Sequence, residues 1–420
     1  MPSSGWISTS RTLFHVPRQS GGHPRLTMTI VALVIILVVV LVIWPPIRPA
    51  ATAALPAAPP PRPPVVVVES LPQLTEQVSR WGSSGQFTGG VLVARGDEVL
   101  FRQVHGFANR NLGKPLDLNS RFRLASVSKQ FTAAAILRLQ DEGVLSTDDP
   151  LCKWIKPCPS AWEPIRLHHM LSHSSGIPDL MARPAWGIRR VTPASMDELT
   201  SESMQYGLQF PPGTKVRYNN AAYNLLGAVV EKASGETLHA YLRSAFFEPL
   251  GMAATGYDDG ASQVVMGYAN LAGGLTEQPN ANVSIITGAG ALYSTLDDLL
   301  VWQRALHGGR LLSPRGYGMM IADHAPADTP PERGRPRRSW GFGVFGNRIG
   351  QRVAPAFADR QIFHTGSWSG FRNLVSYQPD GDVTVIVLSN NYHSRDAVFL
   401  LSQQGMAEAL GRPFPTALAR

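Results

Sequence analysis

Residues 123–140 read RLASVSKQFTAAAILRLQ. This stretch predicts a helix in the core of the fold and raises a chemical question. Its run of alanine, leucine and isoleucine, free of glycine and proline, predicts a buried helix that Gly143 would end. Ser126 and Lys129 are three residues apart, so their side chains would lie on one face of that helix. A lysine directed into apolar surroundings is costly unless it has a partner or a chemical role there.

The spacing of Ser126 and Lys129 indicates one such role. At a helix N-terminus, free backbone N–H groups and the helix dipole favour negative charge. A serine there could act as a nucleophile, and a lysine one turn on could accept its proton if the lysine pKa were depressed. The pair alone is a common chance pattern, so the interpretation depends on companion residues elsewhere in the chain.

Both ends of the folded part have the pattern of a β-hairpin. Residues 91–94 and 99–104 are strand-like on either side of a turn at 95–97. Near the other end, residues 371–391 repeat the pattern around the turn sequence Pro-Asp-Gly at 379–381. Strands at the two ends of the chain could pair in one antiparallel sheet.

Between the hairpins the pattern is mainly helical. One helix is expected to start near Ala221 and to end near Gly235. Another opens with the capping-box-like pair Thr295 and Asp298 and ends at the two glycines 308–309. The expected fold class is therefore α+β: an antiparallel sheet built from both chain ends, flanked by helices, with an inserted helical lobe. A cleft between the sheet and the lobe is a natural place for a site.

The N-terminal region predicts attachment to a membrane. Residues 26–44 are nineteen residues without a charge, about enough to cross a bilayer core of roughly 30 Å. Arginines within residues 1–25 favour a cytoplasmic N-terminus and an exported remainder, which we expect on the periplasmic or extracytoplasmic side. Residues 45–64, with nine prolines, would be a stiff linker to a domain at 65–420. The alternative is a signal peptide cleaved near residues 51–53.

Charge and composition exclude a basic nucleic-acid-binding domain. The net charge is +8, but residues 1–68 contain five arginines and no acid, so most of the excess lies outside the expected domain. With 44% apolar and 16% charged residues, the composition is that of a globular protein. We expect no nucleic-acid partner.

The two cysteines, Cys152 and Cys158, could close a small loop by a disulfide in an exported domain. Two free thiols or a metal pair are the alternatives, although no second Cys/His pair has zinc-finger spacing. His169 and His173 have helical metal-ligand spacing beside His168, but no glutamate follows His169 as a zinc protease motif requires. We therefore expect no metal site, and the chemistry expected of Ser126 and Lys129 implies no organic cofactor.

Five stretches in a fixed order resemble one protein family. They read FRLASVSKQFTAAAILRL, LSHSSGIPD, VRYNNAAYNLLGAVVEKASG, GAGALYSTLDDLLVW and FHTGSWSGF. Together they resemble the superfamily of serine β-lactamases and penicillin-binding proteins, specifically its class C-like branch of β-lactamases, D-peptidases and esterases. The resemblance covers roughly residues 74–408, and several motifs in order are far more specific than any one of them.

The resemblance implies three catalytic residues. Ser126 would be the acylated nucleophile, and Lys129 would share its proton. Tyr218 would act with Lys129 as general base and then protonate the leaving group. The backbone N–H groups of Ser126 and Ser367 would form the oxyanion hole.

The resemblance also implies a substrate-binding wall. Asn220 would bind the acyl-side amide of the substrate or orient Lys129. His364, Thr365 and Gly366 would line the opposite wall on a strand. Many penicillin-recognising members have lysine where His364 stands, and a neutral histidine would capture a substrate carboxylate less strongly.

The function expected from these residues is that of a membrane-tethered serine hydrolase. It would act through a Ser126 acyl-enzyme on an ester, an amide or a β-lactam. One alternative is a β-lactamase or D-peptidase proper acting on peptidoglycan-like substrates. The other is a non-catalytic penicillin-recognising sensor of the cell envelope.

Overall fold

The computed structural model describes residues 70–184, 186–260, 264–271, 274–278, 282–331 and 337–419. The predicted cytoplasmic segment, membrane anchor and proline-rich linker lie outside these residues. Within them, no helix has the length and apolar character needed to cross a bilayer.

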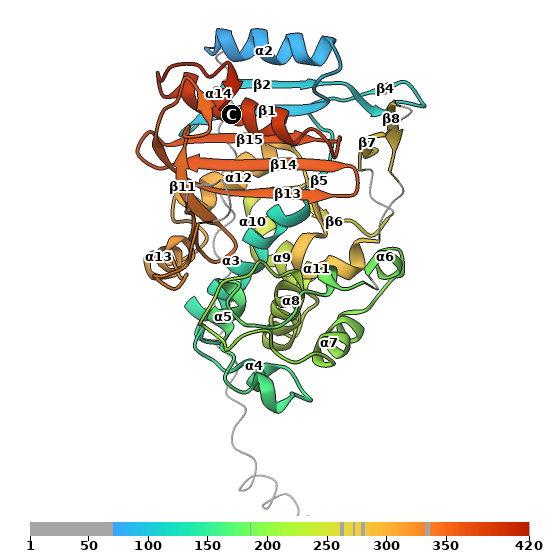
Figure 1. Cartoon of the computed structure of the whole chain (residues 1–420), viewed down its shortest axis with the longest axis vertical. Helices are drawn as coiled ribbons and strands as arrows, with labels where there is room; N and C mark the ends of the chain where they lie inside the picture. Colours follow the sequence, from blue (N-terminus) through green and yellow to red (C-terminus); the bar gives the residue numbers. More distant parts are fainter. Residues whose placement is uncertain are drawn as a thin grey trace, which may run out of the picture. The chain divides into compact units, whose positions relative to one another are not determined.

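A seven-stranded antiparallel sheet is the centre of the fold, as the sequence predicted (Figure 1). Its order is β10-β11-β13-β14-β15-β1-β2, so strands from both ends of the chain are neighbours. The strands are β1 (Gly89–Arg95), β2 (Glu98–His105), β10 (Ser339–Trp340), β11 (Phe345–Ile349), β13 (Asp359–Trp368), β14 (Phe371–Gln378) and β15 (Val383–Ser389). Strand β1 pairs with β2 on one side and β15 on the other.

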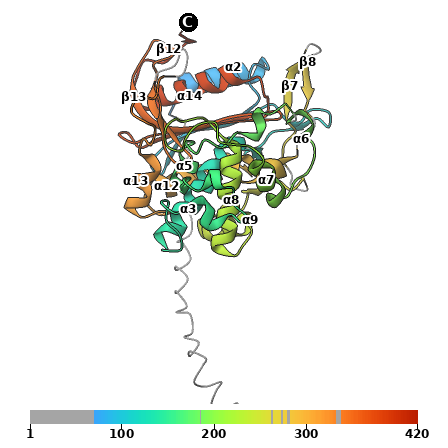
Figure 2. The same ribbon diagram turned by 60° about the horizontal axis from the view of Figure 1, so that its bottom comes forward.

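The central strands are buried on both faces because a helical layer covers each face of the sheet (Figure 2). All seven residues of β15 are buried, as are six of the seven in β1, which explains their near-continuous valine, isoleucine and leucine. Helices α2 (Pro72–Ser83) and α14 (Arg395–Ala409) cover the outer face, near a short strand pair, β12 (Val353–Ala354) and β16 (Ala417–Leu418).

The inner face packs on the helical lobe that the sequence predicted. Its helices are α3 (Lys129–Asp141), α4 (Leu151–Trp154), α5 (Leu167–Leu171), α6 (Trp186–Arg189), α7 (Met196–Met204), α8 (Asn220–Ser234), α9 (Leu238–Leu242), α10 (Glu248–Leu250), α11 (Thr287–Gly290), α12 (Leu296–His307) and α13 (Pro314–Ile321). Helix α3 is central to this layer, with ten of its thirteen residues buried. The larger of two apolar clusters among the described residues joins this helix to α8, α12 and the inner face of the sheet.

Helix ends follow the predicted signals. Gly235 adopts a left-handed conformation (φ +77°) directly after α8, as a C-terminal cap requires. The Thr295 side chain accepts a hydrogen bond from the backbone of Asp298 at the start of α12.

Shorter pieces connect the two layers. They are the three-stranded sheet β5 (Phe122–Arg123), β9 (Leu292–Ser294) and β6 (Gly256–Tyr257), and the pairs β3 (Phe107–Asn109) with β4 (Lys114–Pro115) and β7 (Tyr268–Leu271) with β8 (Gly274–Glu277). The 3₁₀ turns are η1 (Ala125–Ser128), η2 (Ser160–Trp162), η3 (Leu180–Ala182) and η5 (Val283–Ile286), and η4 (Arg243–Phe247) is a short π-helix.

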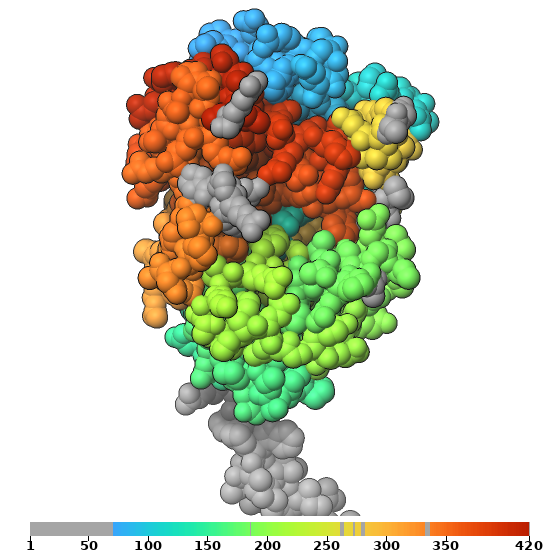
Figure 3. Space-filling view, viewed as in Figure 1, coloured from blue at the N-terminus to red at the C-terminus, as the bar shows by residue number. Residues whose placement is uncertain are grey.

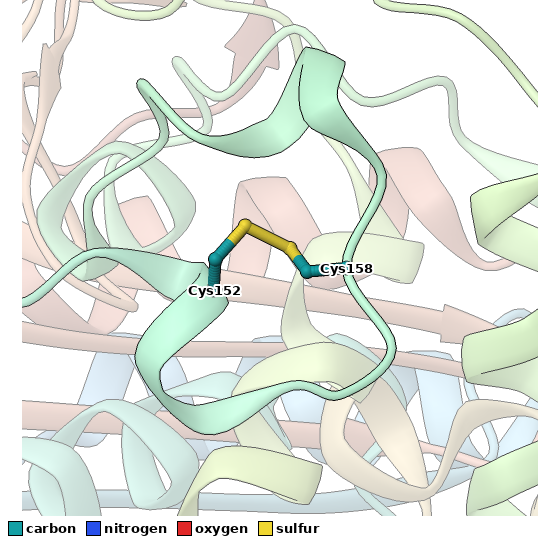
Figure 4. The surroundings of a disulfide bond; sticks show 2 residues. All are labelled: Cys152 and Cys158. Carbon is teal, nitrogen blue, oxygen red and sulfur yellow. A yellow bond between two sulfur atoms is a disulfide. The ribbon is translucent and has the colours of Figure 1, made fainter.

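Cys152 and Cys158 are joined by a disulfide (Figure 4). The bond closes a loop of six-residue separation that includes α4, at the end of the helical lobe farthest from the sheet (Figure 1). It therefore lies away from β13 and η1, where the predicted catalytic residues lie.

Candidate active site

Ser126 lies on η1, immediately before α3. The predicted helix thus begins with a 3₁₀ turn, and the regular α-helix starts only at Lys129. Ala125 has a positive φ of +50°, so the backbone turns sharply just before the serine. The side chain of Asn373 on β14 donates to the carbonyls of Arg123 (2.8 Å) and Leu124 (3.2 Å), which holds this turn against the sheet.

Lys129 is completely buried behind Ser126. Its Nζ lies 3.2 Å from Ser126 Oγ, 2.9 Å from Asn220 Oδ1 and 2.8 Å from the carbonyl oxygen of Ala289. A neutral amine has two N–H groups and one lone pair. It can donate to the two carbonyl-type oxygens and still accept the proton of the serine hydroxyl.

The environment of Lys129 favours the neutral amine more than usual. Burial lowers its pKa to about 7, against the opposing effect of the negative charge of Asp179. A lysine with this pKa is deprotonated in a substantial fraction of molecules at neutral pH. It can therefore serve as a proton acceptor for a hydroxyl 3.2 Å away.

Tyr218 comes from the loop before α8 and faces the same serine. Burial raises the pKa of its phenol, and the hydrogen bond with Ser126 opposes this effect only in part. The ring also lies 4.9 Å from Lys129 Nζ. At neutral pH the phenol therefore keeps its proton, and Lys129 is the better base of the two.

His173 helps to position Tyr218. It is buried, its ring packs 4.6 Å from the Tyr218 ring, and its Nδ1 accepts a hydrogen bond from the backbone of Asn219. Burial lowers the pKa of His173 well below its usual value, so the ring is neutral.

Among the described residues, no group of three or more potential ligands could hold a metal ion.

Asn220, the first residue of α8, connects Lys129 to an acid that the sequence interpretation did not assign. Its Oδ1 accepts from Lys129, and its Nδ2 donates to Asp179 Oδ2 at 2.9 Å. Asp179 is the last residue of LSHSSGIPD and the N-cap of η3. An acid next to a proline is a common turn and cap signal, so sequence alone did not distinguish this site residue from an ordinary cap.

Strand β13 forms the opposite wall. His364 is buried (1% exposed), and its Nδ1 lies 2.7 Å from the carbonyl oxygen of Thr365. Burial, with smaller effects of the charges on Lys129 and Arg338, lowers the pKa of His364 to about 3. Because a carbonyl oxygen only accepts, Nδ1 carries the proton and Nε2 is an acceptor. Within the described residues, this Nε2 has no hydrogen-bond partner.

Gly366 allows β13 to approach η1 closely. A Cβ at this position would lie 2.1 Å from the carbonyl oxygen of Leu124, a distance that no side chain tolerates. Gly366 does not itself line the cavity, whereas its neighbours Thr365 and Ser367 do. The absent side chain therefore brings the backbone of Ser367 towards Ser126.

A cavity of about 290 Å³ is lined by six of the eight predicted catalytic and binding residues, all except Lys129 and Gly366. The ones that line it are Ser126, Tyr218, Asn220, His364, Thr365 and Ser367. In the space-filling view, this face is hollowed between the orange-red C-terminal segments and the green helical segments (Figure 3).

Residues not predicted from the sequence complete the cavity wall, notably Arg338 and Trp368. Arg338 belongs to the arginine- and proline-rich stretch before β10, and its guanidinium lies 3.9 Å from the centre of the Phe345 ring. An arginine- and proline-rich composition is typical of a solvated surface loop, although it also fits a flap over a cleft. The position of Arg338 in this cavity depends on loop conformation, which the sequence pattern does not encode.

Comparison with known proteins identifies the family. A family model described as Beta-lactamase matches residues 73–404. The chain is 28% identical over 329 residues to a penicillin-binding protein of Bacillus subtilis (strain 168), covering 74% of this chain and 69% of that protein. It is 31% identical over 290 residues to esterase EstB of Burkholderia gladioli, covering 60% of this chain and 73% of the esterase.

The fold has a matching solved structure. The octameric penicillin-binding protein homologue from Pyrococcus abyssi superposes with a TM-score of 0.69 at 26% identity, covering 81% of this chain and 77% of that one. The matched share includes most of the part of the chain that the structure describes.

Proposed function

The chain belongs to the Beta-lactamase family of serine hydrolases, and we propose that it cleaves esters or amides through an acyl-enzyme on Ser126. The observation that carries this proposal is the contact between Lys129 Nζ and Ser126 Oγ at 3.2 Å, combined with a lysine pKa of about 7. A nucleophile and a base in hydrogen-bond reach, with the base itself oriented by further groups, are the requirements for an activated serine.

In acylation, Ser126 Oγ attacks the substrate carbonyl carbon while Lys129 takes the hydroxyl proton. The negative charge that develops on the carbonyl oxygen is stabilised by the backbone N–H groups of Ser126 and Ser367. The bond to the leaving group then breaks, and Tyr218 donates its proton to that group. Lys129 returns a proton to Tyr218, which leaves both residues neutral.

Deacylation repeats these steps with water in place of the serine hydroxyl. A water molecule attacks the acyl carbon and gives its proton to the base, and the bond to Ser126 Oγ breaks. The serine regains its proton, and the carboxylic acid product leaves. No step requires an electron acceptor or an electron donor.

We favour an ester as the scissile bond over a β-lactam. The neutral His364 offers a hydrogen-bond acceptor at Nε2 and not the cation that lysine provides in many penicillin-recognising relatives. The likeness to an esterase at 31% identity agrees with this preference. A D-peptidase or β-lactamase activity on peptidoglycan-like substrates is the second candidate, favoured by the likeness to penicillin-binding proteins.

We also propose that residues 26–44 anchor the protein in the cytoplasmic membrane and that residues 45–64 hold the hydrolase domain on the extracytoplasmic side. The support is the uncharged length of the first segment and the proline content of the second. Membrane association of the full chain that survives alkaline carbonate washing, and is lost on deletion of residues 26–44, is the expected result. A full chain released by the wash would contradict the anchor.

Intact-protein mass spectrometry tests the catalytic proposal. The full chain is incubated with p-nitrophenyl acetate, a chromogenic cephalosporin and a fluorophosphonate, beside Ser126→Ala. An adduct that depends on Ser126 and disappears as product forms is the expected result. Ser84→Ala, which alters an exposed serine at the end of α2, is the matched control and should label normally.

Two other outcomes would change the assignment. An adduct on Ser126 that persists with every substrate would favour the sensor over the hydrolase. Turnover by Ser126→Ala equal to that of the native protein would overturn Ser126 as the nucleophile.

A further inference from the structure

A second cavity, of about 430 Å³, lies between the start of α14 and strands β11, β13 and β14. It is larger than the catalytic cavity and strongly cationic. Its lining includes five arginines and one acid, Asp396; the arginines, which we call the arginine groove, are Arg338, Arg348, Arg352, Arg372 and Arg395.

The arginine groove adjoins the catalytic cavity. Arg338 and Thr365 line both cavities. The reason is the length of β11, which pairs with β13 only over residues 359–363. Beyond Phe363, β13 has no partner from β11, and Thr365, which lines both cavities, lies on this open edge. A ligand lying across the edge could reach from one cavity into the other.

Four of the five arginines of the groove have no carboxylate partner among the described residues. In the part of the chain that the structure describes, Arg348, Arg352, Arg372 and Arg395 form no ion pair with a carboxylate. Arg372 donates instead to the carbonyl oxygen of Tyr392 at 3.2 Å, and Arg352 lies 5.6 Å from the centre of the Phe399 ring. The guanidinium of Arg372 is partly buried and close enough to Arg395 for their charges to repel.

Arginines on a convex surface are usually solvated one by one. Around a concave cavity, the positive potentials of several arginines add up inside the cavity. The planar guanidinium group matches carboxylate and phosphate oxygens with two parallel hydrogen bonds. His364, in contrast, is neutral and cannot supply a cation to the catalytic cavity. The counter-charge for an anionic group of a substrate would therefore come from Arg338, which lines both cavities, and from the other arginines of the groove.

We propose that the arginine groove binds the anionic part of an extended substrate, a part carrying carboxylate or phosphate groups, while the scissile carbonyl lies at Ser126. This inference rests on the proposed hydrolase function and specifies its substrate class. The natural substrate is then an ester or amide joined to a polyanionic arm.

The first test compares matched p-nitrophenyl esters on the full chain. Their acyl chains, of graded length, end in a carboxylate, in a phosphate monoester or in a neutral methyl ester. We expect at least one charged series to be preferred over the neutral one by about tenfold or more in kcat/KM. The preference should decline as salt is raised, and the better of the two charged series identifies the anion.

The second part of the test uses matched double variants. Arg348→Gln/Arg352→Gln removes two charges from the groove, and Arg310→Gln/Arg315→Gln removes two exposed charges elsewhere. The ratio of kcat/KM for the charged ester to kcat/KM for the neutral ester should fall towards one in the groove variant. In the control variant, this ratio should equal that of the native protein. Equal ratios in the native protein and the groove variant, or an equal fall in the control, would overturn the proposal.

Binding without turnover separates this inference from the catalytic one. Tripolyphosphate is titrated calorimetrically into full-length Ser126→Ala, with and without each pair of arginine substitutions. Affinity lowered about tenfold or more by the groove substitutions alone supports the proposal. Equal affinity for tripolyphosphate with the groove substitutions and with the control substitutions would overturn the proposal, independently of the ester results. Failure of every ester in the native protein would instead contradict the proposed hydrolase function.

Discussion

Asp179 and Asn220 are joined by a hydrogen bond of 2.9 Å from the amide Nδ2 to the carboxylate Oδ2. The oxygen of the same amide accepts from Lys129 Nζ. An amide that donates on one side and accepts on the other has only one orientation. Asp179 thus fixes the group that contacts the buried lysine, and its charge opposes the effect of burial on the lysine pKa.

Asp179→Asn should separate these two effects. Asparagine retains an oxygen that can accept from Asn220 but removes the negative charge that favours protonated Lys129. The pKa of Lys129 should fall further, so kcat/KM for a neutral ester should reach half its maximum at a lower pH than in the native protein. Asp97→Asn removes a charge whose side chain is 87% exposed and should leave the profile in place. An unmoved profile for Asp179→Asn would show that the acid has no electrostatic effect on catalysis.

The pH dependence of the native protein should reveal Lys129. Below pH 7 the amine is protonated and cannot accept the proton of Ser126, whereas above pH 7 it is neutral. We therefore expect kcat/KM to rise with pH through about 7 and then to level off. Lys129→Ala should lose about 10²-fold or more in kcat/KM and should no longer show this rise. A rate independent of pH between 5 and 9 would contradict Lys129 as the base.

His364→Gln should leave that pH dependence unchanged. Because the pKa of His364 is about 3, the ring is neutral throughout the range in which Lys129 titrates. The substitution should alter KM through lost contact with the substrate, while the midpoint of the profile stays near 7. If His364→Gln lost the midpoint near pH 7, the group that titrates would be His364 and not Lys129.

Gly366→Ala should impair turnover strongly. The added Cβ would collide with the carbonyl oxygen of Leu124, so β13 must move away from η1 and with it the proposed oxyanion donor Ser367. Loss of one such donor costs about 3–4 kcal/mol of transition-state stabilisation, or about 10²–10³-fold in rate. Gly207→Ala, where the Cβ meets no atom within 4 Å, is the matched control. Thermal melts of both variants distinguish a displaced strand from an unfolded one, and native turnover by Gly366→Ala would contradict the close approach.

Removal of the disulfide should affect stability and not catalysis. The loop between Cys152 and Cys158 is short, so the chain-entropy contribution of the bond to the free energy of unfolding is about 2 kcal/mol. Cys152→Ser/Cys158→Ser should lose roughly this amount in urea unfolding, and reduction of the native protein should reproduce the loss. Turnover of a neutral ester should remain native, because the loop lies at the far end of the helical lobe. A large loss of turnover in the folded variant would show unexpected coupling to the active site.

The fold class and the position of the site could be predicted because they follow from strong local patterns. The two hairpins carry their own turn signals, and the helix ends at Gly235 and Thr295 carry their own caps. Ser126 and Tyr218 are distant in sequence, and only the order of the motifs placed them together.

The remaining features depend on conformations that local patterns do not contain. The 3₁₀ turn at Ser126 is stabilised from another strand by Asn373, a contact that residues 123–140 cannot reveal. Asp179 and Arg338 lie in loops, and their importance comes from what they face after folding. Electrostatics that decide the protonation of Lys129 are likewise a property of the packed structure.

The pairing of β1 with β15 has a consequence for how the protein is made. These partners are about 290 residues apart along the chain, so β1 has no β15 to pair with until nearly the whole domain has emerged from the ribosome. Until then, one edge of the β1–β2 hairpin is unpaired and apolar, the kind of edge that promotes aggregation. A chain that terminates before residue 383 would retain Ser126, Lys129 and Tyr218 but leave the edges of β1 and β14 open. Such a truncated chain should accumulate as aggregate even though it contains the proposed catalytic residues.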